Sequence, residues 1–327
     1  MNPVNPLKLI ILSDIHYAGA AERARGDDYE SRVIRPPVRR ALARLFRHYV
    51  WMRQPLERGR LLDQFLAECG PADRVIVNGD HACNSAFIGF SDPATRESAR
   101  ECLDKIRARF GDRAHFVMGD HELGKVMMFS GVGGMRLASW RACAELPGLK
   151  PLWRLTLGRY VLLAVASPLL ALPGNRADAL PEEWPEWERL RAEHLAEVRA
   201  AFDALQPDER VLLFCHDPTA LPYLGQEEAV RRRLPQIEAT IIGHLHTNLV
   251  LWKARLLANL PPIRFLGHTT EKLTTALSRS KQWRPFKIKL CPALGGIQLL
   301  NDGGYFTVSL DPAARRPAEF TFHPVKR

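Results

Sequence analysis

Five short apolar segments along the chain each end abruptly in a polar cluster that contains aspartate or histidine. Each segment is rich in branched aliphatic residues and is short, as expected of a buried strand. The segments are KLIILSDIH (8–16), RVIVNGDH (74–81), AHFVMGDHE (114–122), RVLLFCHD (210–217) and ATIIGHLH (239–246). The pattern predicts five strands whose ends carry the polar chemistry.

Helix-like segments lie between these strands, at residues 92–110, 185–205 and 226–234. This alternation is typical of stacked sheets covered by helices. Near the end of the chain, GIQLLNDGGYFTVSLD (296–311) alternates around an Asp-Gly-Gly turn and predicts a β-hairpin. We therefore expect a single α/β domain over residues 1–327, with a β-rich C-terminus and no linker.

Residues 17–60 lack strand character and predict a helical insertion within this domain. On a helix, one stripe is apolar and the opposite face is basic. The apolar stripe contains Val38, Leu42, Leu45, Phe46 and Tyr49, and the basic face contains Arg39, Arg40, Arg44 and Arg47. In one interpretation, the apolar face docks on the protein's own core. In the other, the helix lies on a membrane surface or covers acyl chains, with Trp51 at its edge and the arginines facing anionic headgroups.

The charge of the chain is concentrated in this insertion. The protein has 46 Lys and Arg against 36 Asp and Glu, a formal charge of +10. Residues 31–60 contain nine arginines and one acid, Glu57, a net +8. Such charge favours anionic partners, which include phosphates, lipid headgroups and nucleic acid.

Cysteine usage and hydropathy favour a cytoplasmic protein that is soluble or peripheral to a membrane. The six cysteines are scattered without a C-x-x-C pair, which suits reduced thiols. The longest apolar run, residues 160–172, is too short to span a bilayer and contains Pro168. The N-terminal apolar run is interrupted by Asp14, so we interpret it as a strand rather than a secretory signal.

The polar strand ends supply a set of oxygen and nitrogen donors without any thiolate. Members of the pairs Asp14/His16 and His244/His246 are two residues apart, so on an extended chain both would project to one side. Such donors suit Mn, Fe, Zn or Ni, and two ions would clamp and polarise a phosphoryl group. The complete set is Asp14, His16, Asp80, Asp120, His216, His244 and His246.

The order of these motifs resembles the calcineurin-like metallophosphoesterase superfamily over roughly residues 7 to 250. The motifs are DIH (14–16), GD (79–80), GDHE (119–122), His216 and GHLH (243–246). The resemblance implies a four-layer α/β/β/α sandwich. It also implies hydrolysis of a phosphate ester or anhydride that depends on two divalent metal ions, for which we expect Mn, with Fe, Zn and Ni as alternatives.

The resemblance also implies a role for each residue. One metal would be held by Asp14, His16, Asp80 and His246, and the other by Asp80, Asp120, His216 and His244, with Asp80 bridging. His121 would be a general acid that protonates the leaving oxygen, and Glu122 would orient it. Of the remaining histidines, His81 is of interest because it follows Asp80.

Asp120 departs from the family pattern, in which asparagine usually occupies this position. The amide donor to phosphate is lost and a negative charge is added beside an anionic substrate. Lys125 is a candidate compensating cation, and a phosphodiester or anhydride would suit the site better than a dianionic monoester. The alternative is that Asp120 marks an inactive binding member.

For the substrate, the basic insertion is similar to that of UDP-2,3-diacylglucosamine pyrophosphohydrolases. These enzymes cleave a lipid-linked nucleotide at the inner membrane surface during lipid A biosynthesis. We prefer this interpretation over a soluble phosphodiesterase, nucleotidase, protein phosphatase or nuclease. Nucleic acid is therefore a less favoured partner than lipid. A metal-stabilised, non-catalytic membrane-binding protein is the remaining alternative. The sequence indicates no oligomeric state.

Overall fold

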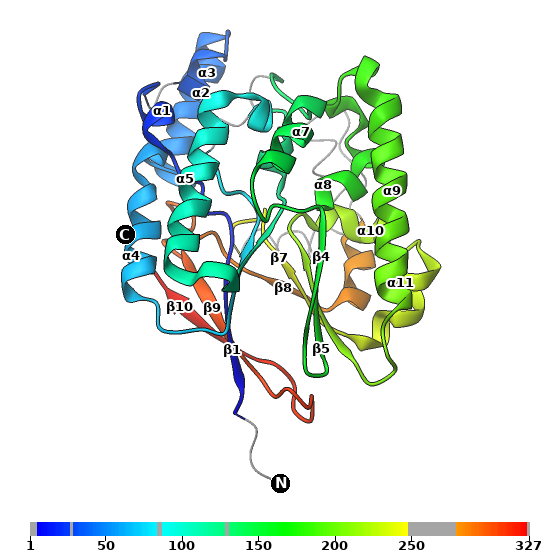
Figure 1. The fold of residues 1–327 in the computed structure, drawn as a ribbon. Helices are drawn as coiled ribbons and strands as arrows, with labels where there is room; N and C mark the ends of the chain where they lie inside the picture. The colour runs from blue at the N-terminus through cyan, green and yellow to red at the C-terminus, as the bar shows by residue number, and fades with distance from the viewer. Residues whose placement is uncertain (1–4, 27–28, 84–86, 128–130, 248–278, 326–327) are drawn as a thin grey trace.

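Two five-stranded sheets packed face to face form the centre of the protein (Figure 1). The structure is a computed structural model. The structure describes residues 5–26, 29–83, 87–127, 131–247 and 279–325. The strand orders are β10-β9-β1-β2-β3 and β4-β5-β6-β7-β8. The mixed α/β fold expected from the sequence is confirmed.

The first sheet combines a parallel half and an antiparallel half. β1 (Leu7–Leu12) pairs in parallel with β2 (Arg74–Asn78), which pairs in parallel with β3 (Ala114–Val117). β9 (Gly304–Leu310) runs antiparallel to β1 and to the edge strand β10 (Glu319–Pro324). The carboxyl ends of β1, β2 and β3 therefore meet at one edge of the sheet.

The second sheet is parallel except at one edge. β5 (Tyr160–Val165), β6 (Arg210–Cys215), β7 (Ile237–Ile242) and β8 (Ile288–Leu290) run parallel, and β4 (Leu152–Leu157) pairs antiparallel with β5. The sequence pattern missed β4 and β5, because the apolar run over β5 does not end in a polar cluster.

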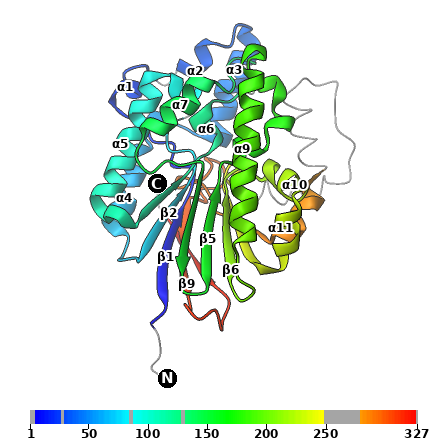
Figure 2. The same cartoon turned by 45° about the vertical axis from the view of Figure 1, so that its right-hand side comes forward.

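Helices cover the outer face of each sheet (Figure 2). On the first sheet lie α4 (Gly59–Glu68) and α5 (Pro93–Phe110), and on the second lie α9 (Trp184–Asp203) and α11 (Glu228–Arg233). The last three match the helices predicted from the sequence. Further helices are α1 (Ala20–Arg23), α2 (Tyr29–Arg32), α6 (Asp120–Leu123), α7 (Leu137–Glu145), α8 (Ser167–Leu170) and α10 (Leu221–Leu224).

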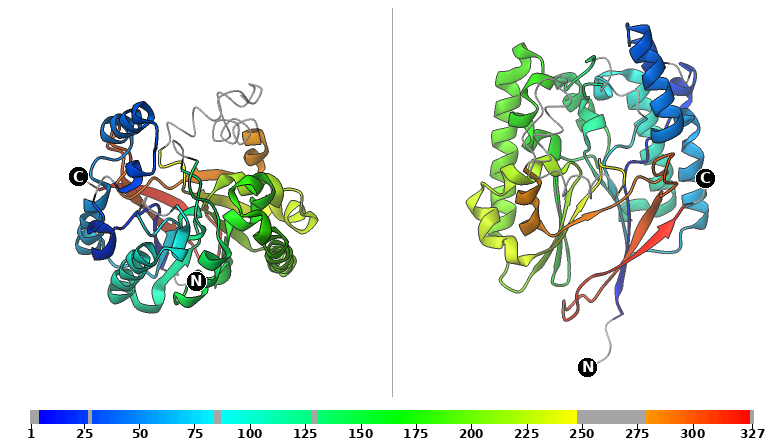
Figure 3. Two further views of the ribbon diagram at one scale, coloured as in Figure 1. Left: turned by 90° about the horizontal axis from the view of Figure 1, so that it is seen from above. Right: turned by 180° about the vertical axis from the view of Figure 1, so that it is seen from behind.

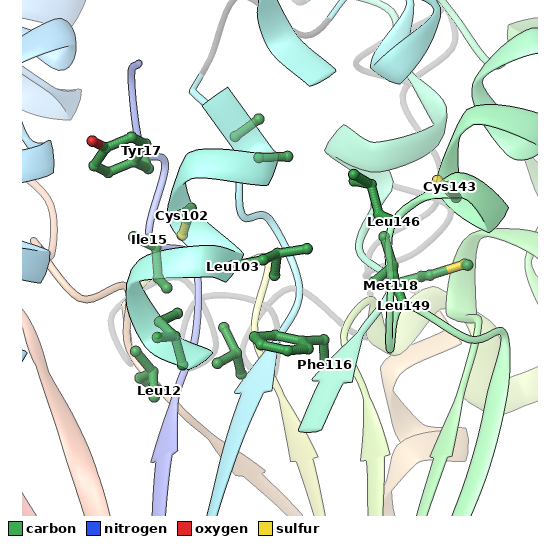
Figure 4. Packing of buried hydrophobic residues seen from close by; sticks show 14 of the residues in the cluster. Leu12, Ile15, Tyr17, Cys102, Leu103, Phe116, Met118, Cys143, Leu146 and Leu149 are labelled. Atoms are coloured by element: carbon green, nitrogen blue, oxygen red, sulfur yellow. The ribbon is translucent and has the colours of Figure 1, made fainter. Parts of the chain in front are cut away.

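The alternation of side chains along β1 shows how the four layers are built. Ile10 and Leu12 pack outward against the helices, in a cluster that includes Leu103 of α5 (Figure 4). Leu9 and Ile11 pack inward, in the cluster shared by the two sheets. Since all four side chains are fully buried, the strand is apolar on both faces, as expected between two layers.

The hairpin predicted around Asp302 is wrong in its first arm. Residues 298–300 form a turn, and β9 pairs with β10 instead. Gly296 has φ +56°, and a Cβ there would lie 2.3 Å from the backbone nitrogen of Gly303. The chain folds back on itself here, and Asp302 Oδ1 accepts a hydrogen bond from Ile297 N at 3.1 Å. A strand cannot form within so tight a loop.

The insertion contains helices, and its apolar face points outward. α3 (Pro37–Phe46) continues into a π-helix over Arg47–Trp51. Four apolar side chains of this segment are largely exposed: Val38 (70%), Leu42 (56%), Leu45 (54%) and Tyr49 (64%). The interpretation in which this face docks on the protein's own core is therefore wrong.

The inner side of α3 is formed by small and basic residues. Ala43 is buried. Arg40 Nε donates to the Ile34 carbonyl at 2.9 Å, and Arg44 Nε donates to Ser31 Oγ at 3.2 Å. Part of the face predicted to meet headgroups is thus turned toward the protein. None of the helices in the described ranges combines the length and hydropathy needed to cross a bilayer.

Candidate metal centre

The seven residues singled out in the sequence lie together at the carboxyl ends of β1, β2, β3, β6 and β7. Their oxygen and nitrogen atoms form two groups, and the atoms of each group all lie within 4.8 Å of one another. One group is Asp14, His16, Asp80 and His246, and the other is Asp80, Asp120, His216 and His244. These are the groups that the resemblance implied, and Asp80 belongs to both. That these residues bind metal stays a prediction.

Left-handed backbone conformations are concentrated at this site. Nine described residues other than glycine have positive φ, and five belong to the two groups: Asp14 (50°), His16 (51°), Asp80 (55°), His244 (59°) and His246 (59°). Each costs about 1 kcal/mol or more. The argument from an extended chain is therefore wrong. Left-handed turns beyond the strand ends bring Asp14 and His16 into one group, whereas His244 and His246 belong to different groups.

Close packing explains the glycines that precede Asp80 and Asp120. Gly79 has φ +86°, and a Cβ there would lie 2.4 Å from His216 Nδ1. A Cβ at Gly119 would lie 2.3 Å from Asp80 Oδ1. Both distances are too short for a side chain, so the G-D spacing lets the loop after β2 approach the loops after β3 and β6.

His216 is oriented by a backbone carbonyl of the neighbouring sheet. Its Nδ1 donates to the Asn78 carbonyl at 2.5 Å. This leaves Nε2 facing two carboxylates, with Asp80 Oδ2 at 3.2 Å and Asp120 Oδ1 at 3.4 Å. A lone pair aimed at two carboxylates needs a cation or a proton between them, which is the usual arrangement of a histidine ligand.

Several buried polar atoms at the site make no hydrogen bond within the described part of the chain. They include Asp80 Oδ2 and His216 Nε2 in the donor groups and His121 Nε2 beside them. Unpaired buried polar atoms are costly and rare. The Nε2 atoms of His16 and His246 also lie 3.3 Å apart, close to the spacing of about 3 Å expected of two nitrogens bound to one ion. The donors therefore fit divalent transition-metal ions.

The pKa values of the site show how strongly its carboxylates demand positive charge. Burial raises the pKa of Asp14 to about 7, although His216 opposes the shift. Burial lowers the pKa of His244, but the Asp120 carboxylate outweighs it and raises this pKa to about 9. Protons on histidine thus balance the carboxylates when no ion is bound, and ion binding would release them.

Asp120 has cationic neighbours on both sides. His244 Nδ1 lies 2.9 Å from Oδ1, and Lys125 Nζ lies 3.6 Å from Oδ2. Burial raises the pKa of Asp120, but His244 and Lys125 outweigh it and hold the pKa well below its usual range. Asp120 is therefore ionised, and Lys125 lies where a compensating cation was expected.

His121 is fully buried beside both groups but belongs to neither. Its backbone N donates to Asp80 Oδ1 at 3.1 Å, and its Nδ1 lies 3.3 Å from the Cys83 carbonyl. Nε2 lies 3.7 Å from Asp80 Oδ2. Burial lowers the pKa of His121, partly opposed by Asp80. With Nδ1 donating to Cys83, Nε2 is the atom that faces the site.

Glu122 contacts a different histidine from the one predicted. Its carboxylate accepts from His81 Nδ1 at 3.0 Å and from His81 N at 2.9 Å. It also accepts from Asp80 N at 3.2 Å and Gly119 N at 2.5 Å. No hydrogen bond to His121 is found among these contacts. Glu122 thus ties the loop after β2 to the loop after β3, and the prediction that it orients His121 directly is wrong.

The insertion reaches the site through Trp51, which sequence reasoning had placed on a lipid-facing surface. The Trp51 ring lies 4.6 Å from the His246 ring, and Phe46 stacks on Trp51 at 6.2 Å. Both aromatic side chains are half-buried. The sequence signal for this contact was only the position of Trp51 at the end of the amphipathic stripe.

In a comparison with protein families, residues 7–248 match calcineurin-like phosphoesterase. The chain belongs to this family. Phosphoesterases of this family depend on divalent metal, so the chain is a metal-dependent phosphoesterase. No curated protein matches the sequence. A Streptococcus pneumoniae crystal structure, described as a conserved uncharacterized protein and predicted phosphoesterase, covers 98% of this chain and 99% of its own. At 12% identity and a TM-score of 0.29, it adds nothing to the argument.

We expect Mn²⁺ to raise the melting temperature of this phosphoesterase, and Asp80→Asn to remove most of the rise. At a hundredfold excess over Kd, one site adds about 2.7 kcal/mol of stability, and Asp80 belongs to both groups. Differential scanning fluorimetry with and without Mn²⁺ measures the shift. Asp203→Asn is the control, since this side chain is 54% exposed and lies on α9. An equal rise in Asp80→Asn and wild type would contradict the shared ligand.

Proposed function

We propose that this phosphoesterase hydrolyses a phosphodiester or diphosphate bond and uses two divalent ions that share Asp80. The observation that carries the proposal is the pair of donor groups with one fully buried carboxylate in common. Two bound ions would polarise the phosphoryl group and stabilise charge on the attacking and leaving oxygens. We propose Mn, with Fe, Zn and Ni as alternatives that suit the same donors.

The protein's own groups supply the remaining functions. His121 presents Nε2 to the site while Nδ1 lies against the Cys83 carbonyl, and we propose that Nε2 gives a proton to the leaving oxygen. Burial lowers the pKa of His121, but a phosphate anion bound beside it raises that pKa again. We propose that Lys125, whose Nζ lies 3.6 Å from Asp120 Oδ2, contacts a substrate oxygen.

The charge of Asp120 favours a substrate with one negative charge on each phosphate. Asp14, Asp80 and Asp120 are three carboxylates within the two groups. A dianionic monoester adds more repulsion to this cluster than a diester or an internal diphosphate. This supports the finer proposal of a lipid-linked nucleotide cleaved at the inner membrane surface, as in UDP-2,3-diacylglucosamine pyrophosphohydrolases of lipid A biosynthesis.

The local charge of the insertion and its position beside the site also support that finer proposal. The basic segment 31–60 contains Trp51, whose ring contacts the His246 ring. A substrate with anionic and apolar parts would meet both kinds of surface there. Under this proposal the protein is cytoplasmic and peripheral to the membrane.

His121→Ala should lower kcat for a phosphodiester by about a hundredfold to ten-thousandfold, the usual contribution of a general acid. Metal content should remain that of the wild type, because His121 lies outside both donor groups. Steady-state kinetics with bis(p-nitrophenyl) phosphate and metal analysis of the same sample give both quantities. Loss of bound metal in this variant would show that His121 is a ligand instead.

Asp120→Asn should raise the ratio of monoester to diester kcat/KM several-fold, because it removes one negative charge from the site. The assay compares p-nitrophenyl phosphate, bis(p-nitrophenyl) phosphate, a lipid-linked nucleotide diphosphate and single-stranded DNA, with Mn²⁺, Mg²⁺ or Zn²⁺.

Product analysis across this panel tests the proposed function itself. Preferred cleavage of the diphosphate by the wild type supports the lipid-linked substrate, and preferred cleavage of DNA supports a nuclease instead. Hydrolysis of none of the four would contradict the proposed function, and an unchanged ratio in Asp120→Asn would contradict the role of its charge.

A further inference from the structure

The outward apolar side of the insertion is the main exposed hydrophobic feature in the described parts of the chain. Among the described residues, nine large apolar side chains are exposed, and four of these nine lie on α3 and the π-helix. Single exposed apolar residues are ordinary, but a contiguous patch on one helix face usually marks an interaction surface. The four residues are Val38, Leu42, Leu45 and Tyr49.

A loop near the C-terminus extends this apolar side. Leu299 N donates to the Val50 carbonyl at 3.1 Å, and Gln298 N donates to the Trp51 carbonyl at 2.8 Å. Leu299 and the adjacent Leu300 are 60% and 41% exposed. We define the outward face as Val38, Leu42, Leu45, Tyr49, Leu299 and Leu300, which is six of the nine exposed apolar side chains.

The orientation of α3 is fixed from its other side. Ala43 is buried there, and the hydrogen bonds of Arg40 and Arg44 tie this side to residues 31–34. Turning the apolar residues inward would break both hydrogen bonds and move the buried Ala43 toward solvent. The exposure of the outward face is therefore a property of how the helix is attached.

The charge around the outward face indicates what it binds. Residues 31–60 carry a net +8, and Arg35, Arg39 and Arg53 are exposed. Two copies of the chain would bring the same positive charge together, which opposes self-association. Nucleic acid would satisfy the arginines but would leave the leucines in water. An anionic lipid bilayer satisfies both, because apolar side chains enter the acyl boundary while arginines meet the headgroups.

The position of the outward face relative to the donor groups agrees with this partner. α3 stands at the end of the molecule toward which β1 and β2 run (Figure 3). Along α3, Phe46 follows the outward residues, and its ring stacks on Trp51, which contacts His246. A lipid headgroup held beside this helix would therefore lie near the proposed metal centre.

We propose that the outward face docks this protein on anionic lipid bilayers. This inference names the residues that hold the protein at the membrane surface. It rests on the proposed function for the lipid nature of the substrate. Docking needs no turnover, so it is measured separately from hydrolysis.

The test is flotation of the full chain with vesicles of phosphatidylcholine alone or with 30% phosphatidylglycerol. Leu42→Ser/Leu45→Ser removes apolar contacts and keeps every charge, and Arg35→Gln/Arg39→Gln does the reverse. The matched control is Val132→Ser/Phe322→Ser, which removes two exposed apolar side chains outside the outward face. Melting temperatures and gel-filtration volumes of all four proteins show folding and oligomeric state.

The wild type and the control should float with the anionic vesicles, and each of the other variants should bind at least tenfold more weakly. Wild-type binding to neutral vesicles should also be at least tenfold weaker. Equal flotation of Leu42→Ser/Leu45→Ser and wild type would overturn the proposal. Absence of wild-type flotation would overturn the proposal too. In that case, a lower melting temperature of Leu42→Ser/Leu45→Ser would indicate that the outward face packs against another part of the chain. Dissociation of a dimer in this variant would indicate that it packs against a second copy. Flotation without phosphoesterase activity would retain the docking surface and reject the proposed function.

Discussion

The burial of Asp80 where the carboxyl ends of the two sheets meet is the constraint on which the rest of the site depends. This carboxylate is fully buried, takes a hydrogen bond from His121 N, and belongs to both donor groups. One of its oxygens, Oδ2, has no hydrogen-bond partner in the described structure. A buried carboxylate with an unpaired oxygen is stable only beside positive charge. The surrounding histidines and the proposed ions supply that charge.

The fold provides this arrangement at a cost in backbone strain. Five residues of the two donor groups have left-handed backbone conformations, each costing about 1 kcal/mol or more. The net stability of a domain is only about 5–15 kcal/mol, so this strain is a substantial fraction of it. Buried strands in both sheets and the hydrogen bonds made by Glu122 and by the Asn78 carbonyl hold the loops in place. Ion binding would add the stability that the strained loops lack.

The sequence predicted those parts that depend on local pattern. Strands that end in Asp or His were visible because an apolar run stopped at a polar cluster, and β4 and β5 were missed because no such stop occurs there. A helical pattern assigned opposite faces to Leu42 and Arg40, but it carries no information about which face meets the body. Glu122 and His81 are distant in sequence and meet only because β2 and β3 pair. The contact of Trp51 with His246 likewise depends on how the insertion is attached.

The central claim is that two ions share Asp80. Electron paramagnetic resonance during titration of the metal-free protein with Mn²⁺ tests it most directly. If the ions share this carboxylate, the six-line signal of an isolated ion should give way, as the second equivalent is added, to the broadened spectrum of two exchange-coupled ions. A six-line signal that only doubles in intensity, or binding that saturates at one equivalent, would contradict the shared centre.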